Sequence, residues 1–129
     1  GDRLLDGKTT GLGMWEASMN NTYGAIDMIP KDITICDWHY EKAEPTAAFF
    51  ALKGFDVVTS SWQKGAVAKA QLAFLENLKK NANAETAGHI KGMVHTSWSS
   101  VSSFLDRFYA PFDENKLDDV VCFRMLFGE

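Results

Sequence analysis

The chain has 129 residues, which is enough for one domain with a buried core, whereas a complete eight-fold β/α barrel typically needs about 250. Apolar residues make up 46% of the sequence, which excludes a disordered chain. The net charge of -4 and the isoelectric point near 5.3 offer no basic face for nucleic acid, so a neutral ligand fits better.

The N-terminal part of the sequence gives mixed signals. Residues 1–13 are rich in glycine, threonine and charged residues, a composition typical of a loop. Residues 15–28 favour a helix only in part, because two asparagines and a glycine within them lower the helix propensity. Pro30 ends any helix that forms there.

A strand, a helix and a second strand are predicted next. The apolar, β-branched run 33–38 predicts a strand. Pro45 suits the first position of a short helix over 46–52, and Gly54 suits its C-terminal cap. Residues 55–60 then predict the second strand.

The following segments repeat this alternation. Residues 63–80 are the clearest helix, because apolar residues recur at helical spacing and two lysines stand in the last turn. A polar connection over 81–88 leads to a third predicted strand over 90–97. An apolar stripe over 101–108 predicts another helix.

The C-terminal part predicts one more helix. Pro111 breaks the preceding helix, and the last helix is expected to open at Asp113 or Glu114 and to stop before Gly128. The alternation of strands and helices implies an α/β fold with parallel strands and right-handed crossovers. We find no linker, so residues 1–129 are expected to form a single domain.

Each predicted strand ends in small polar residues followed by a tryptophan: Trp38, Trp62 and Trp98. Because the carboxyl ends of parallel strands meet at the ligand site of α/β folds, these indoles are expected to line one concavity. Sugar rings pack on aromatic faces, and a buried aromatic side chain offers about 150–250 Å² of contact area. Sugar hydroxyls also need polar partners, for which the candidates are Asp37, His39 and Ser97. The alternative places the tryptophans in the core of a non-catalytic structural or interaction domain.

A metal site is a second interpretation of the same region. Asp37, His39 and Glu41 alternate, so they would share one face if the strand continued. His95 is a possible fourth ligand, although the spacing matches no specific metal signature. The simpler interpretation has Asp37 and His39 hydrogen-bonded to neighbouring loops. We therefore expect neither a metal nor a cofactor.

Signals for catalysis within the chain are weak. Glu16 follows Trp15 and is a candidate carboxylate, with Asp2 and Asp6 as further acidic residues. Glycoside hydrolysis usually needs a pair of carboxyl groups about 5–10 Å apart, and the sequence does not show that any two of these converge. Phosphate-binding glycine motifs, nucleophile elbows and cysteine–histidine motifs are absent as well. We predict no catalytic residue in this chain.

The two cysteines are predicted to be buried free thiols, because Cys36 lies in a strand-like run and Cys122 in a helical run. A disulfide between them is the less favoured alternative. The sequence shows no secretory signal and no apolar run long enough to span a membrane. The cellular location is left open.

The order of these segments resembles the last third of the catalytic barrel of glycoside hydrolase family 20, the β-N-acetylhexosaminidases and their relatives. The segments that carry the resemblance are Gly1-Asp2, 33–38, 53–60 and 95–99. That family has a strand ending in tryptophan, then a Lys-Gly-aromatic strand, then a final strand ending Trp-Ser-Glu. The resemblance extends to about residue 109, and its motifs are moderately specific in order and individually weak.

The resemblance implies a partial TIM-type (β/α) barrel with about three parallel strands, running from the end of the sixth barrel strand through the eighth. It implies a hydrolase of N-acetylhexosamine-type sugars, whose acid catalyst is the Glu of an Asp-Glu pair on the fourth strand. That pair would lie upstream of this chain. Trp38 and Trp98 match family positions that line the sugar subsite. The chain would thus supply an aromatic binding wall and be inactive alone.

Two departures from the family pattern bear on specificity. The final Trp-Ser-Glu is here Trp98-Ser99-Ser100, so a carboxylate that binds sugar hydroxyls is replaced by a hydroxyl. The family's tyrosine after the Lys-Gly strand is replaced by Trp62 or is missing. Both changes leave the sugar and its linkage open.

Three parallel strands cannot close a barrel, so their edges and inner face would stay exposed. We expect the isolated chain to self-associate or to pair with the missing N-terminal part of the barrel. Alternatively, residues 15–28 fold across the opening. Carbohydrate is the expected ligand, with neither nucleic acid nor a membrane as partner.

Overall fold

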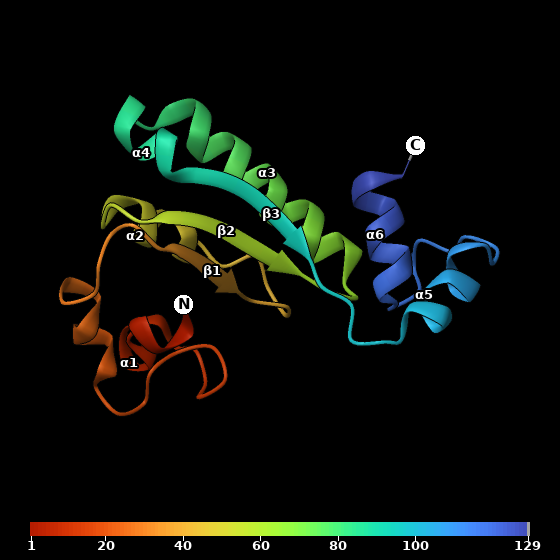
Figure 1. Ribbon diagram of the computed structural model, residues 1–129, viewed down its shortest axis with the longest axis horizontal. Helices are drawn as coiled ribbons and strands as arrows, with labels where there is room; N and C mark the ends of the chain where they lie inside the picture. The colour runs from red at the N-terminus through yellow and green to blue at the C-terminus, as the bar shows by residue number, and fades with distance from the viewer. Residues whose placement is uncertain (129) are drawn as a thin grey trace.

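The computed structural model describes residues 1–128 as an α/β fold with one three-stranded sheet, in which both strand pairs are parallel. The spatial order of the strands follows the sequence: β1 (Thr34–Trp38), β2 (Asp56–Ser61) and β3 (Ile90–His95). Their arrows point toward the end of the molecule where the C-terminal helices lie (Figure 1). The predicted alternation of parallel strands and helices is confirmed, and it is consistent with part of a β/α barrel.

Helical crossovers connect the strands. Helix α2 (Thr46–Leu52) leads from β1 to β2 with the bounds that the sequence predicts, and Gly54 follows it in the left-handed conformation expected of a cap, with φ 80°. Helix α3 (Gly65–Asn81) leads toward β3. The polar segment 81–88, predicted as a plain connection, instead contains most of helix α4 (Ala84–His89). The Asn83 side chain caps this short helix by accepting a hydrogen bond from the amide of Thr86.

The N-terminal segment packs beside β1 (Figure 1). Its short helices are η1 (Asp2–Leu4), α1 (Gly7–Thr10) and η2 (Thr22–Asp27). The ambiguous region 15–28 is therefore mostly turn and 3-10 helix, and Asn21 with φ 64° interrupts any regular helix there. Leu5, Ala17 and Ile26 of this segment enter the hydrophobic core. The N-terminal segment thus shares one hydrophobic core with the sheet.

The C-terminal helices α5 (Val101–Phe108) and α6 (Asp119–Phe127) lie beyond the carboxyl ends of the strands (Figure 1). Helix α6 begins at Asp119, six residues after the first position predicted for it. The reason is its cap, because the side chain of Asp118 accepts a hydrogen bond from the amide of Val120 at 2.9 Å. Asp113 instead belongs to a turn, in which its carbonyl accepts from the amide of Lys116 at 3.1 Å. Helix α6 packs against α3.

The two faces of the sheet differ in burial. Ile35 and Val57 point into the core, where they meet Phe50 of α2 and are at most 4% exposed. The alternate residues of β1, among them Cys36 and Trp38, are exposed on the other face. The prediction that Cys36 is buried is therefore wrong, because no element of residues 1–128 covers that face at β1. Cys122 is buried as predicted, and both thiols are free.

Candidate functional site

Four aromatic rings meet at the carboxyl ends of the strands, and we call them the aromatic wall: Trp38, Tyr40, Trp62 and Trp98. The indoles of Trp38 and Trp98 stack with their centroids 5.5 Å apart and an interplanar angle of 12°. The Tyr40 ring stands edge-on to Trp38 at 5.6 Å and contacts Trp62 at 5.4 Å. The structure thus brings together the three tryptophans that end the predicted strands, and Tyr40 joins them.

Hydrogen bonds hold the polar edges of the wall. The indole Nε1 of Trp98 donates to the Tyr40 hydroxyl at 3.1 Å. That hydroxyl lies 2.5 Å from Oγ1 of Thr96, which itself donates to the carbonyl of Ser61 at the end of β2. Trp98 remains 64% exposed and Trp38 37% exposed, so the wall presents apolar faces to solvent.

Asp37 and His39 form a buried layer beneath the wall. Each residue is 1% exposed. The imidazole lies between two carboxylates, with Nε2 3.1 Å from Asp37 and Nδ1 3.2 Å from Glu16. The second oxygen of Asp37 accepts from the Thr46 hydroxyl at 2.7 Å. The sequence offered both side chains as contacts for sugar hydroxyls, but the structure gives them internal partners and no solvent access.

The geometry favours a protonated imidazole at His39. A neutral ring has one N–H, so it would turn a lone pair toward one of the two carboxylates. Burial alone lowers the pKa of His39, but the hydrogen bonds and negative charge of Asp37, together with those of Glu16, outweigh it and raise the pKa above its ordinary value. The charged ring therefore ties the N-terminal segment to the residues that carry the wall.

A polar groove opens beside the wall, with a volume of about 350 Å³. Two indoles of the wall line it together with residues of α5, α6 and the segments before them: Trp62, Gln63, Trp98, Ser99, Ser103, Arg107, Leu117, Asp118 and Asp119. The guanidinium of Arg107 holds the groove together. It donates to Asp118 at 2.8 Å, to Asp119, and to the Ser99 hydroxyl at 2.6 Å. The hydroxyl of Ser97 also donates to Asp119, so this predicted sugar contact borders the groove.

The two carboxyl groups of the groove are ionised. Burial acts to raise the pKa of Asp118, but the amide of Val120 and the guanidinium of Arg107 outweigh it and lower that pKa. Burial also acts to raise the pKa of Asp119, and hydrogen bonds from Arg107 and Ser97 lower it overall. Both groups are thus hydrogen-bond acceptors and not proton donors near neutral pH.

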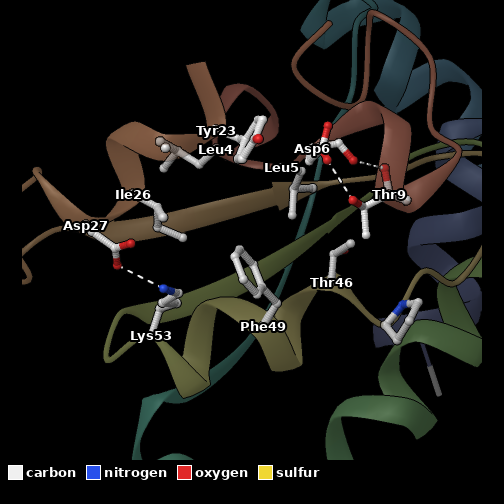
Figure 2. Close-up of a pocket in the computed structure, with 13 residues that line it drawn as sticks. Leu4, Leu5, Asp6, Thr9, Tyr23, Ile26, Asp27, Thr46, Phe49 and Lys53 are labelled. Atoms are coloured by element: carbon white, nitrogen blue, oxygen red, sulfur yellow. Dashed lines mark hydrogen bonds and ion pairs between the residues drawn. The ribbon is translucent and has the colours of Figure 1, made fainter. Parts of the chain in front are cut away.

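A second, more apolar cleft of about 580 Å³ lies between the N-terminal segment and α2 (Figure 2). Leu5, Ile26 and Phe49 are among its lining residues, and the ion pair between Lys53 and Asp27, 2.9 Å long, spans one end. At the other end Asp6 accepts from the Thr9 hydroxyl at 2.6 Å. The cleft shares no lining residue with the polar groove.

The residues considered for a metal site do not converge. Glu41 pairs with Lys64 at 2.5 Å, and Nδ1 of His95 lies 3.0 Å from the Ser61 hydroxyl, whereas His39 pairs with Asp37. Within residues 1–128, no group of three or more His, Cys, Asp or Glu residues is placed to hold a metal ion. The further acidic candidates lie elsewhere, since Asp6 caps α1.

Sequence reasoning missed several residues of the site. Tyr40 carried a usable signal, because it alternates with Trp38 and would share its face in an extended segment. Arg107 on α5 and Asp118 and Asp119 at the start of α6 carried none, because they lie beyond the third strand and its tryptophan. The packing of α6 against α3 and α5 brings these groups together at the strand ends.

Comparison with protein-family models finds no match for this chain, and comparison with curated proteins finds none either. Across residues 1–128, the structure contains no helix with the length and apolar character needed to cross a membrane.

Proposed function

We propose that the aromatic wall is one side of a carbohydrate-binding site at the strand ends of a β/α barrel, and that it binds N-acetylhexosamine-type sugars. The observation that carries the proposal is the stack of Trp38 and Trp98, which leaves the indole of Trp98 64% exposed at the carboxyl ends of parallel strands. Ligand sites of α/β folds lie at these ends. A rigid exposed indole there offers a flat apolar face for the C–H patch of a pyranose.

The surroundings of the wall support a sugar more than a purely apolar ligand. The groove next to Trp98 holds hydroxyl, guanidinium and carboxylate groups, which are hydrogen-bond partners for sugar hydroxyls. Small-molecule sites typically combine apolar walls with a few placed polar groups. The alternative, in which the tryptophans are core residues of a structural domain, is disfavoured by the exposure of Trp98 and Trp38.

We further propose that the chain alone does not hydrolyse glycosides. General-acid catalysis needs a carboxyl group that keeps its proton near neutral pH, and the two carboxyl groups at the groove have lowered pKa values. Asp37 is bonded to His39 and Thr46 beneath the wall. As a glycoside hydrolase domain, the chain would depend on catalytic carboxyl groups from another part of the barrel.

The expected partner is that other part of the barrel. Cys36 and Trp38 are exposed on the open face of β1, and within residues 1–128 both β1 and β3 pair on one side only. Unpaired strand edges accept further strands. A second copy of the chain would use the same edges, so a concentration-dependent increase in mass in sedimentation experiments is the outcome expected of self-association.

Sugar binding can be tested by calorimetry with N-acetylglucosamine and its β-linked dimer. Trp98→Ala is expected to weaken binding about tenfold or more, equivalent to about 1.4 kcal/mol, because the apolar platform is lost. Trp15→Ala is the matched control, since Trp15 is 82% exposed and lies in the N-terminal segment outside the wall. Equal loss in both variants, or no binding to the unmodified chain, would contradict the proposal and favour a structural domain.

A further inference from the structure

The polar groove retains hydrogen-bonding capacity that its own residues do not use. Arg107 has five N–H donors, and four of them are engaged, by Ser103, Asp118, Asp119 and Ser99. One N–H on Nη2 is left. Within residues 1–128 the hydroxyl of Ser103 has no hydrogen-bond partner either, although the backbone of Ser103 is bonded on both sides. A ligand in the groove would find donors already held in place.

The charges of the groove are balanced. Asp118 and Asp119 are the two carboxylates, and Arg107 contacts both. Lys116 adds a second cation, with its Nζ 3.2 Å from Asp118. Because each carboxylate is compensated, the groove has no uncompensated cation for an anionic ligand. A further carboxylate placed there would find no unpaired cation, and a charge taken out of water without a partner is disfavoured.

The size of the groove limits the ligand further. Its volume of about 350 Å³ is near the lower end of the roughly 300–1,000 Å³ typical of small-molecule sites. Trp62, Trp98 and Leu117 supply the apolar part of the lining. Its polar part includes Ser99, Arg107 and Asp119. This combination suits one ring with an apolar face and a polar rim.

We propose that the polar groove is a subsite for a single uncharged pyranose ring, which contacts Trp62 and Trp98 and binds through its hydroxyls to Arg107, Ser99 and Ser103. The inference rests on the proposed sugar-binding function and adds the residues, ring number and charge preference of the subsite. It does not depend on the identity of any catalytic group.

A steric block tests the location of the subsite. Ser103 is exposed and lines the groove, so Ser103→Tyr fills the groove without disturbing the core. Ser102→Tyr is the matched control, because Ser102 is also exposed on the same helix and lies outside the lining. In calorimetry with N-acetylglucosamine, we expect about tenfold weaker binding for Ser103→Tyr and less than about twofold change for Ser102→Tyr. If Ser103→Tyr does not fold, Leu117→Trp fills the same groove from a residue that is 63% exposed.

The outcomes separate the subsite from the proposed function. Binding that is lost in Trp98→Ala but unchanged in Ser103→Tyr would place the sugar outside the groove, so the subsite would be wrong while sugar binding stands. No binding to the unmodified chain would overturn both. For the charge preference, methyl glucoside is compared with methyl glucuronide, which differs from it mainly by a carboxylate. Glucuronide binding as tight as, or tighter than, glucoside binding would overturn the preference for an uncharged ring.

Discussion

Residues 37–40 place two different layers on opposite sides of one short segment. Asp37 and His39 are buried among hydrogen bonds, whereas Trp38 and Tyr40 belong to the partly exposed aromatic wall. The alternation follows from the two-residue period of extended backbone. One layer fixes the segment through charge, and the other offers contact area to a ligand. Stability and binding should therefore respond to different substitutions within four consecutive residues.

The largest expected effect within this segment is that of His39→Ala on stability. The substitution removes the cation between Asp37 and Glu16 and leaves a buried carboxylate without its partner. Removing one member of a buried ion pair typically costs about 3–5 kcal/mol. Urea denaturation measures the loss. His89→Ala is the control, because His89 pairs with the more exposed Asp56, and its effect should be much smaller.

The pH dependence of the free energy of unfolding should show the contribution of His39. The pKa of His39 is raised above the ordinary 6.5, so the folded chain binds this proton more tightly than the unfolded chain. The resulting contribution is complete below about pH 6.5 and is lost as the pH rises through the raised pKa. The urea concentration at the denaturation midpoint should therefore decrease as the pH rises through the raised pKa.

Two variants test whether His39 causes this pH dependence. His39→Gln should remove the alkaline decline. His95 acts in the opposite direction, because burial lowers its pKa and its contribution is lost as the pH falls. His95→Gln should consequently leave the alkaline decline unchanged. An alkaline decline that persists in His39→Gln would show that another group carries it.

Trp98→Ala should affect stability less than it affects binding. The side chain is 64% exposed, so its main loss is the stack on Trp38, and aromatic pairs contribute about 0.5–1.5 kcal/mol. Phe50→Ala is the comparison, because Phe50 is 0% exposed and core truncations of phenylalanine cost about 3–5 kcal/mol. Thermal or urea unfolding of the two variants measures the difference. Equal destabilisation would mean that the wall belongs to the core.

The smallest effect on stability is expected from alkylating the exposed thiol of Cys36. Cys36 is exposed on the open face of β1, whereas burial raises the pKa of Cys122 to about 11. Because the thiolate is the reactive form, iodoacetamide should modify Cys36 first and leave the folded chain intact. Mass spectrometry after timed labelling gives the order. Protection of Cys36 that grows with protein concentration would show that a second copy covers this face.

Local sequence signals predicted much of the fold. Apolar runs with β-branched residues located the three strands, and Pro45 and Gly54 located α2. The prediction for the polar segment 81–88 was wrong. Its composition suggested a loop, but the Asn83 cap stabilises a short helix there. The start of α6 was misplaced for a similar reason, since several acidic residues can serve as a cap and tertiary packing selected Asp118.

The site was less predictable than the fold. The tryptophans could be located because each follows a strand, and parallel strands carry their ends to one place. The burial of Asp37 and His39 could not, because their partners come from distant segments: Glu16 bonds His39, and Thr46 of α2 bonds Asp37. The exposure of Cys36 likewise depends on which elements cover the sheet, which strand propensity does not encode.

The order of the strands has a consequence for how such a chain can vary. Within residues 1–128, each strand pairs only with the strands next to it in the sequence, and at least one helix follows each strand before the next begins. In a sheet with this order, a strand–helix unit can be duplicated or exchanged at an edge. The hydrogen-bonded pairing of the remaining strands then stays unchanged. Because each tryptophan follows its own strand, a duplicated or exchanged unit would carry its tryptophan to the new strand end. New wall compositions could therefore arise by recombination of whole units, without redesign of the existing ones.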